Sequence, residues 1–321
     1  MSYGQDAKIG ISFQNSFGTA NVASMHWLEP ISESVDLKKA ENMMKGINGA
    51  IDENASIEGL NTIAGDVVIE AKANALGVIL AANNASPTTV TSGTIYTHTF
   101  KPRQGDHSVL SAERPFTYLK NLSDGGSAHQ YANLNAASME LSIANGELMT
   151  AKMSVVGGDY SRVGSMASVF SASNPIDWSV SSVSVSAVAV TNIRSLTISQ
   201  DNKLSSKAFL DGSKTPGRIK RTDRRSISVS GTITFDDQTY LNMFLAQSEQ
   251  RMTINLRGNS LVSSGYYEAL AIDIPNLRFL EFPIVVGGAA ELEVSFKAKA
   301  KYNIGSGTAI AYTLTCGKAG F

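Results

Sequence analysis

Cysteine is almost absent from this chain of 321 residues, which contains only Cys316. A single cysteine cannot form an intrachain disulfide, and no group of Cys and His residues has the spacing of a zinc site. The four histidines fall in different predicted elements and show no paired spacing. The sequence therefore supports neither a disulfide scaffold nor a metal protein.

Long apolar runs are missing as well. The longest, residues 75–82, is far shorter than the ~20 residues that a membrane helix needs. Residues 1–6 lack the basic segment and the apolar segment of a secretory signal. We therefore expect a soluble protein, made in a cytoplasm, that has no membrane partner.

Excess charge and catalytic motifs are equally scarce. A formal net charge of −1 and a pI near 6.4 exclude a globally basic nucleic-acid binder. No Gly-x-Ser-x-Gly elbow, Walker loop or zincin motif occurs, and capping of a helix explains the acidic pair Asp236 and Asp237. Residues 52–59 resemble a calcium loop only faintly, because Ile63 stands where a bidentate Glu belongs. The sequence predicts no enzyme and no cofactor.

A strand followed by a short helix is the clearest positive pattern. Apolar residues alternate through residues 63–70, and Leu76, Ile79 and Leu80 then have the spacing of one helical stripe. The same order returns in residues 227–235, where Gly231 stands in the place of Gly65. The helical triple returns there as well, as Leu241, Phe244 and Leu245. The pattern predicts two copies of one unit.

A second match extends the repeat towards the end of each copy. Residues 139–145 and 155–158 resemble residues 271–276 and 285–288. From Gly65 to Gly157 the first copy spans 92 positions, and from Gly231 to Gly287 the second copy spans 56. The first copy therefore holds 36 extra residues. We predict a tandem duplication with a first domain at 1–165, an insertion at about 83–130, a linker at 166–182 and a second domain at 183–321.

Strands dominate the predicted secondary structure. We expect long strands at residues 24–39 and 179–190, further strands at 94–100 and 115–122, and an alternating strand at 291–301. Asn145-Gly146 predicts a tight hairpin turn. The fold class is therefore mainly β, with two tandem antiparallel domains that each carry one short helix.

Exposed strand edges offer the best functional information in this pattern. Natural monomers usually protect such edges with charge or proline, and residues 179–190 have little of either. Unprotected edges pair with another chain, here a second copy. The pattern indicates an assembly protein.

Short motifs along the whole chain resemble the tail tube protein of tailed bacteriophages in its two-domain, duplicated form. They are Ile9-Gly10-Ile11-Ser12, Phe17-Gly18-Thr19, Glu29-Pro30-Ile31, Gly65 to Ile69, Leu76-Gly77 and Ile198 to Asn202. Gln14 departs from the family, which often has Glu in the slot before the aromatic-Gly-Thr motif.

The resemblance implies tail-tube-like β-sandwich domains and trimeric rings with pseudo-sixfold symmetry. Such rings would stack into the virion tail tube through which genomic DNA is delivered. It also implies synthesis in the host bacterial cytoplasm and contacts with tape-measure, distal tail and tail-terminator proteins.

The alternative is a secreted or surface β-sandwich binding module, such as an adhesin or carbohydrate binder. The lack of a signal peptide and an aromatic content of only 7% disfavour that alternative.

Two sets of charged residues become candidate sites under this interpretation. The polar faces of the predicted sheet strands suggest a neutral to acidic lumen, with candidates Asp66, Glu70, Glu140 and Asp273. Residues 46–60 carry a formal charge of −3 and their counterpart, residues 203–225, carries +6. We expect complementary charge to set how rings stack, through Asp52, Glu53, Glu58, Lys214, Arg218, Lys220, Arg221, Arg224 and Arg225.

Overall fold

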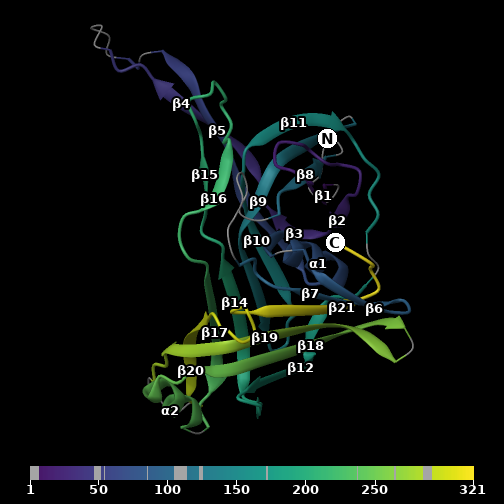
Figure 1. The fold of residues 1–321 in the computed structure, drawn as a ribbon, viewed down its shortest axis with the longest axis vertical. Helices are drawn as coiled ribbons and strands as arrows, with labels where there is room; N and C mark the ends of the chain where they lie inside the picture. The colour runs from purple at the N-terminus through teal and green to yellow at the C-terminus, as the bar shows by residue number, and fades with distance from the viewer. Residues whose placement is uncertain are drawn as a thin grey trace.

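A computed structural model describes residues 7–46, 52–53, 55–84, 86–104, 114–122, 126–170, 173–236, 238–263, 265–284 and 291–321. The described chain is mainly β, and its strands pair antiparallel throughout. This confirms the prediction of a mainly β, antiparallel fold with two helices (Figure 1).

Eleven strands and the longer helix lie in the described residues of the first half. They are β1 (Lys8–Phe13), β2 (His26–Leu28), β3 (Pro30–Glu33), β4 (Asp36–Met43), β5 (Ser56–Glu70), α1 (Ala73–Asn83), β6 (Thr88–Ser92), β7 (Ile95–Phe100), β8 (Phe116–Asn121), β9 (Ser127–Ala144), β10 (Thr150–Gly157) and β11 (Asp159–Gly164).

The second half contains the remaining strands and the shorter helix. They are β12 (Ile176–Val185), β13 (Val188–Val190), β14 (Ile193–Asp201), β15 (Leu204–Lys207), β16 (Arg218–Arg221), β17 (Ser226–Thr234), α2 (Thr239–Ala246), β18 (Gln250–Ser263), β19 (Tyr266–Glu281), β20 (Glu293–Lys301) and β21 (Ala311–Cys316).

One continuous sheet, which we call the main sheet, runs through both halves. Its order is β3 and β4, then β5, β10, β9, β14, β17, β20 and the C-terminal end of β19. The halves join where β9 pairs with β14, with Leu141 opposite Ile198. The two halves therefore share hydrogen-bonded backbone.

Two outer sheets complete the layers. The first contains β2, β1, β8, the N-terminal end of β9 and β11. The second contains β13, β12, β18, the N-terminal end of β19, β21, β7 and β6. The hairpin of β6 and β7, which belongs to the predicted insertion, thus extends a sheet of the second half.

The strand pairings of the first half recur in the second. β5 lies between β4 and β10, as β17 lies between β14 and β20, and a helix follows each central strand. A Cβ atom on Gly65 would lie 2.3 Å from the Ser34 carbonyl oxygen, and one on Gly231 would lie 2.3 Å from that of Ser195. Both glycines therefore admit a close approach of the neighbouring strand. The division into two domains stays a prediction.

The strand ladders allow a second comparison of the two halves. Gly65 pairs with Val155, whereas Gly231 pairs with Phe296. These spans of 90 and 65 residues differ by 25. The match to residues 285–288 lies outside the described residues.

Two predicted long strands are broken in the structure. Residues 24–39 form β2, β3 and the start of β4, because β2 pairs with β1 of an outer sheet whereas β3 and β4 pair with β5. Residues 179–190 form a hairpin of β12 and β13 that turns at Ser186 and Ala187, both with positive φ. β12 begins at Ile176, within the predicted linker.

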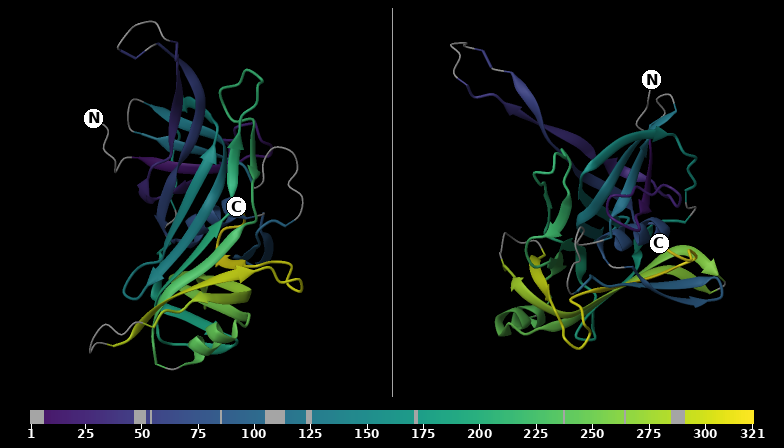
Figure 2. Two further views of the ribbon diagram at one scale, coloured as in Figure 1. Left: turned by 90° about the vertical axis from the view of Figure 1, so that its left-hand side faces the viewer. Right: turned by 45° about the horizontal axis from the view of Figure 1, so that its top comes forward.

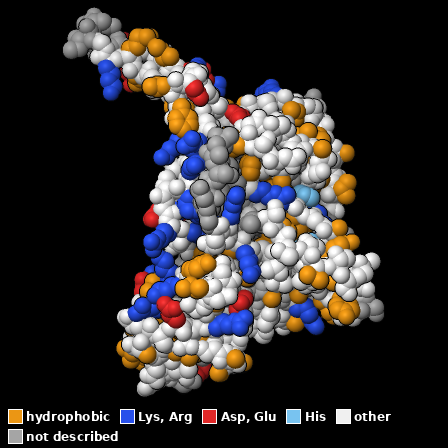
Figure 3. Space-filling view, viewed as in Figure 1, with side chains coloured by type: hydrophobic (Ala, Val, Ile, Leu, Met, Phe, Trp, Pro, Cys, Tyr) orange, Lys and Arg blue, Asp and Glu red, His pale blue; other side chains and the backbone are white. Residues whose placement is uncertain are grey.

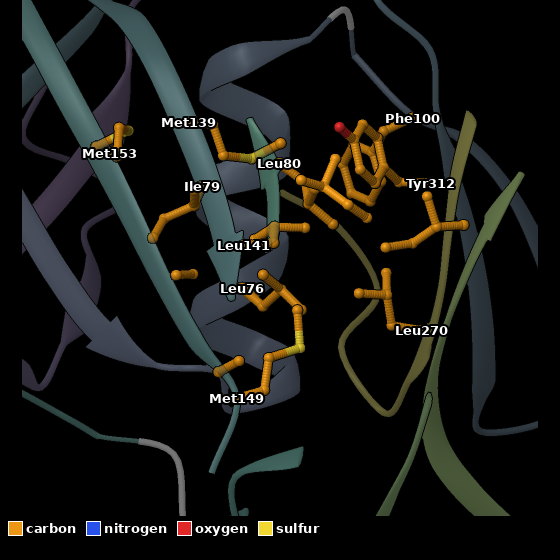
Figure 4. Packing of buried hydrophobic residues seen from close by; sticks show 14 of the residues in the cluster. Leu76, Ile79, Leu80, Phe100, Met139, Leu141, Met149, Met153, Leu270 and Tyr312 are labelled. Atoms are coloured by element: carbon orange, nitrogen blue, oxygen red, sulfur yellow. The ribbon is translucent and has the colours of Figure 1, made fainter. Parts of the chain in front are cut away.

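Helix α1 is buried where the two halves meet. Figure 4 shows Leu76, Ile79 and Leu80 between methionines of the first half and Phe100, Leu270 and Tyr312 on the other side. Phe100 belongs to β7, whereas Leu270 and Tyr312 belong to the second half. The core is therefore continuous across the junction.

Candidate assembly surfaces

The main sheet has an open edge at β4. Within the described part of the chain, β4 pairs only with β5, whereas its counterpart β14 pairs with both β9 and β17. Most β4 residues are consequently exposed, while alternate residues of β14 are buried. β4 can accept another strand.

The opposite edge of the main sheet is also open. Residues 278–281 of β19 pair with β20 alone among the described strands. Leu280, which is one of these residues, is 52% exposed. One chain therefore has one free edge at each side of its main sheet.

The face of the main sheet that points away from α1 is rich in Ser and Thr. Ser142 and Thr197 face each other across the junction of the halves, with their hydroxyl oxygens 3.1 Å apart. The polar row continues through Ser230 to Lys297. Neutral hydroxyl groups thus cover the centre of this face.

Three of the four predicted lumen residues share that polar face. The Lys152 ammonium lies 2.8 Å from the Asp66 carboxylate, and its hydrogen bond lowers the pKa of Asp66. Glu140 stands opposite Lys152 on β9, and Glu70 pairs in register with Thr150. The first half of the face therefore carries acids balanced in part by a lysine.

Asp273 lies elsewhere. Its part of β19 pairs with β18 and β21 of the second outer sheet, and Arg251 holds its carboxylate at 2.7 and 3.1 Å. Sequence reasoning missed Lys297 and Lys299, which carry positive charge onto the polar face of β20. Their alternation with apolar residues was the available signal, but the strand order was needed to interpret it.

The acidic and basic loops meet inside one chain. Lys214 Nζ lies 2.6 Å from the Glu58 carboxylate, and Lys39 lies 3.4 Å from it. The Asn61 amide also donates to the Lys214 carbonyl oxygen at 2.7 Å. Part of the opposite charge of these loops is therefore explained without a neighbouring ring.

Asn202 fixes the base of the hairpin formed by β15 and β16. Arg225 Nε donates to Asn202 Oδ1 at 2.8 Å, and Arg221 donates to the Asn202 carbonyl oxygen. Arg218 lies over the Phe209 ring, 5.3 Å from its centroid. These three arginines therefore have structural contacts within the chain.

The remaining predicted stacking residues lie towards the surface. Arg224, Asp52 and Glu53 are exposed, and Lys220 is partly exposed. Lys and Arg side chains gather along the left-hand side of the body in Figure 3. A basic surface is thus available to a partner.

Other kinds of site find little support. The described residues contain no group of three or more His, Cys, Asp or Glu placed to hold a metal ion. No helix in the described ranges has the length and apolar character needed to cross a membrane. A surface hollow of about 490 Å³ lies between β12 and β14 and is lined mainly by Ser, Val and Ile side chains.

Comparison with known proteins gives one family. The family described as phage tail tube protein matches residues 4–316, nearly the whole chain. No curated individual protein matches the chain. The match agrees with the resemblance seen in the sequence and displaces the alternative of a secreted binding module.

Proposed function

This chain belongs to the phage tail tube protein family, and we propose that three copies of it close into a ring whose bore is lined by the main sheet. The family makes it a structural protein of the virion tail. The main support for this proposal is the pair of open edges, on β4 and on β19, at the two sides of one continuous sheet.

The dimensions suit the passage of DNA. Counting β3 and β4 as one position, three main sheets give about 24 strands. With ~4.8 Å spacing and ~40° tilt, the backbone barrel is roughly 45 to 50 Å across. Side chains leave a bore of ~35 to 40 Å. Duplex DNA passes through an opening of that width.

The polar face of the main sheet would line this bore, because α1 and the outer sheets cover the other face. Asp66, Glu70 and Glu140 are then lumen residues, accompanied by Lys152 and Lys297. Each base that meets a phosphate adds affinity by releasing counterions, so a bore with balanced charge passes DNA more freely than a basic one.

Stacked rings would bring the basic surface of one ring to the acidic arm of the next. The arm formed by β4 and β5 projects from the body (Figure 1), and Asp52 and Glu53 lie in the sequence between these two strands. Lys220 and Arg224 are the best-placed basic partners. Exposed pairs are weak singly, but each ring offers three copies.

The stacking proposal is tested by reversing Lys220 and Arg224 to Glu. We expect a folded subunit that still forms rings but gives shorter tubes in negative-stain images. The matched control is the double exchange of Glu58→Lys with Lys214→Glu, which keeps the pair within the chain and should leave tube length unchanged. Tubes of normal length from the Lys220 and Arg224 variant at physiological salt would refute this use of charge.

Assembly itself is tested by imaging the purified protein. Rings or tubes are the expected result, alone or after addition of the tape-measure, distal tail or tail-terminator proteins of the same virion. A protein that stays monomeric in every one of these mixtures would contradict the proposed function.

A further inference from the structure

The two helices of the repeat differ sharply in how they are covered. Most residues of α1 are buried, whereas none of the eight residues of α2 is buried. Leu80 is the third apolar residue of the stripe on α1 and is fully buried, while its counterpart Leu245 on α2 is 66% exposed. Something outside the described residues of one chain can cover α2.

The second half shows what covers α1. β19 and β21 of that half pack against it. At the C-terminal end of the helix, Gln200 donates to the Asn83 carbonyl oxygen at 3.1 Å, and Asn202 donates to the same oxygen at 3.3 Å. The next half along the main sheet therefore covers part of α1 and satisfies the carbonyl group of its last residue.

Strand register identifies the residues of β4 that correspond to Gln200 and Ile198 of β14. Gln200 pairs with Ile227, four residues before Gly231, and Lys39 pairs with Asn61, four residues before Gly65. By the same count, Leu37 stands on β4 where Ile198 stands on β14. Leu37 and Lys39 are therefore the counterparts of two residues that face α1 or its surrounding core.

These residues cannot reach α2 within one chain. The arm that contains β4 and the helix α2 lie at opposite ends of the long axis of the molecule (Figures 1 and 2). A contact between two different surfaces of identical chains is a head-to-tail contact, and such contacts form a ring when the rotation between successive copies closes. The occupant that fits is a second copy of this chain.

We propose that Leu37 and Lys39 of one copy cover Leu245 and the C-terminal end of α2 in the neighbouring copy. This inference rests on the proposed ring. Leu37 would remove apolar surface of Leu245 from water. The Lys39 ammonium would meet the carbonyl groups at the end of α2, where the helix dipole favours a cation. Glu58 would keep its 2.6 Å pair with Lys214.

Cross-linking tests this contact directly. The double variant Leu37→Cys with Leu245→Cys, treated with a short bismaleimide, should give covalent dimers and closed trimers. The natural Cys316 is buried and should contribute little background. Each single variant, and the control pair Leu37→Cys with Val90→Cys, should stay uncross-linked, because Val90 is equally exposed at 66% but lies on β6.

Charge and polarity variants test whether the contact matters. Leu245→Asp should reduce ring yield at least tenfold, whereas Val90→Asp should not. Lys39→Glu should impair rings more than Lys38→Glu, since Lys38 is paired with Thr62 and points to the opposite face of the same strand. The folded state of each variant is checked by circular dichroism.

The possible failures are distinguishable. Normal rings from Leu245→Asp, together with no cross-link between positions 37 and 245, would overturn this contact and leave the tube function intact. The absence of rings from the unmodified protein under every condition would overturn the proposed function and this contact together.

Discussion

Helices α1 and α2 follow equivalent strands and carry matching apolar triples, yet they occupy different environments. Leu76, Ile79 and Leu80 are fully buried, whereas Leu245 is largely exposed and its companions on α2 are only partly covered. The difference arises because the second half packs on α1, whereas the described residues of the chain leave Leu245 of α2 largely uncovered. Amphipathic spacing thus predicts a helix, but its burial depends on which neighbour the chain supplies.

The largest expected effect comes from truncating the matched leucines. Leu80→Ala should lower the free energy of unfolding by about 2 to 5 kcal/mol, because it leaves a cavity in a continuous core. Leu245→Ala should change the value for the unassembled subunit by no more than about 0.5 kcal/mol, as expected for a surface position. Urea unfolding at one protein concentration measures both. Equal losses would mean that α2 is already covered in the single chain.

A second contrast concerns buried carboxylates. In the first half, Glu33 is paired with Lys120 at 2.9 Å, and both side chains are largely buried. In the second half, Glu268 is buried with one carboxylate oxygen unpartnered, and desolvation raises the pKa of Glu268 to about 7. The protonated form of Glu268 is therefore the form that suits the folded state.

This predicts a dependence of stability on pH. Because the pKa of Glu268 is higher in the folded than in the unfolded protein, its contribution to stability is complete below the pKa of the unfolded state, near 4.5. That contribution is lost as the pH rises through about 7. Between pH 5 and pH 8 the wild-type protein should lose about 1 to 3 kcal/mol relative to Glu268→Gln, which cannot ionise. If the free energies of unfolding of the two proteins changed equally with pH across this range, Glu268 would not titrate there.

The smallest expected effect is a change in stability that has opposite signs in the two helices. A Cβ atom at Gly77 of α1 would lie 2.2 Å from the Phe321 ring, which packs 4.9 Å from the His98 ring. Gly77→Ala should therefore destabilise by about 1 kcal/mol despite better helix propensity. Asn242→Ala, at the exposed counterpart on α2, should stabilise by about 0.5 kcal/mol. Thermal unfolding compares them, and stabilisation by Gly77→Ala would show that the Phe321 contact is dispensable.

Local patterns in the sequence were reliable where neighbours along the chain decide the structure. The repeated strand and helix, the turn at Asn145 and Gly146, and the alternation that became β20 are confirmed. Gly146 has a φ of 84°, a conformation that favours glycine. These features depend on residues only a few positions apart.

Long-range pairings were not predictable in the same way. Nothing local indicates that β7 of the first half pairs with β21, or that Lys214 reaches Glu58 across 156 positions. The second pairing changes the interpretation of the charged loops, because it neutralises part of each within one chain. The sheet that holds Asp273 was not predictable for the same reason, because its strand crosses from one sheet to another.

The central claim is that three copies join through the edges of their main sheets. A cryo-electron microscopy reconstruction of assembled tubes tests it most directly. We expect three chains in each ring, with the β19 edge of one copy beside β4 of the next, so that the main sheet closes around the bore and α2 is covered by the neighbour. Rings whose subunits meet through other surfaces, with β4 and α2 left facing solvent, would contradict it.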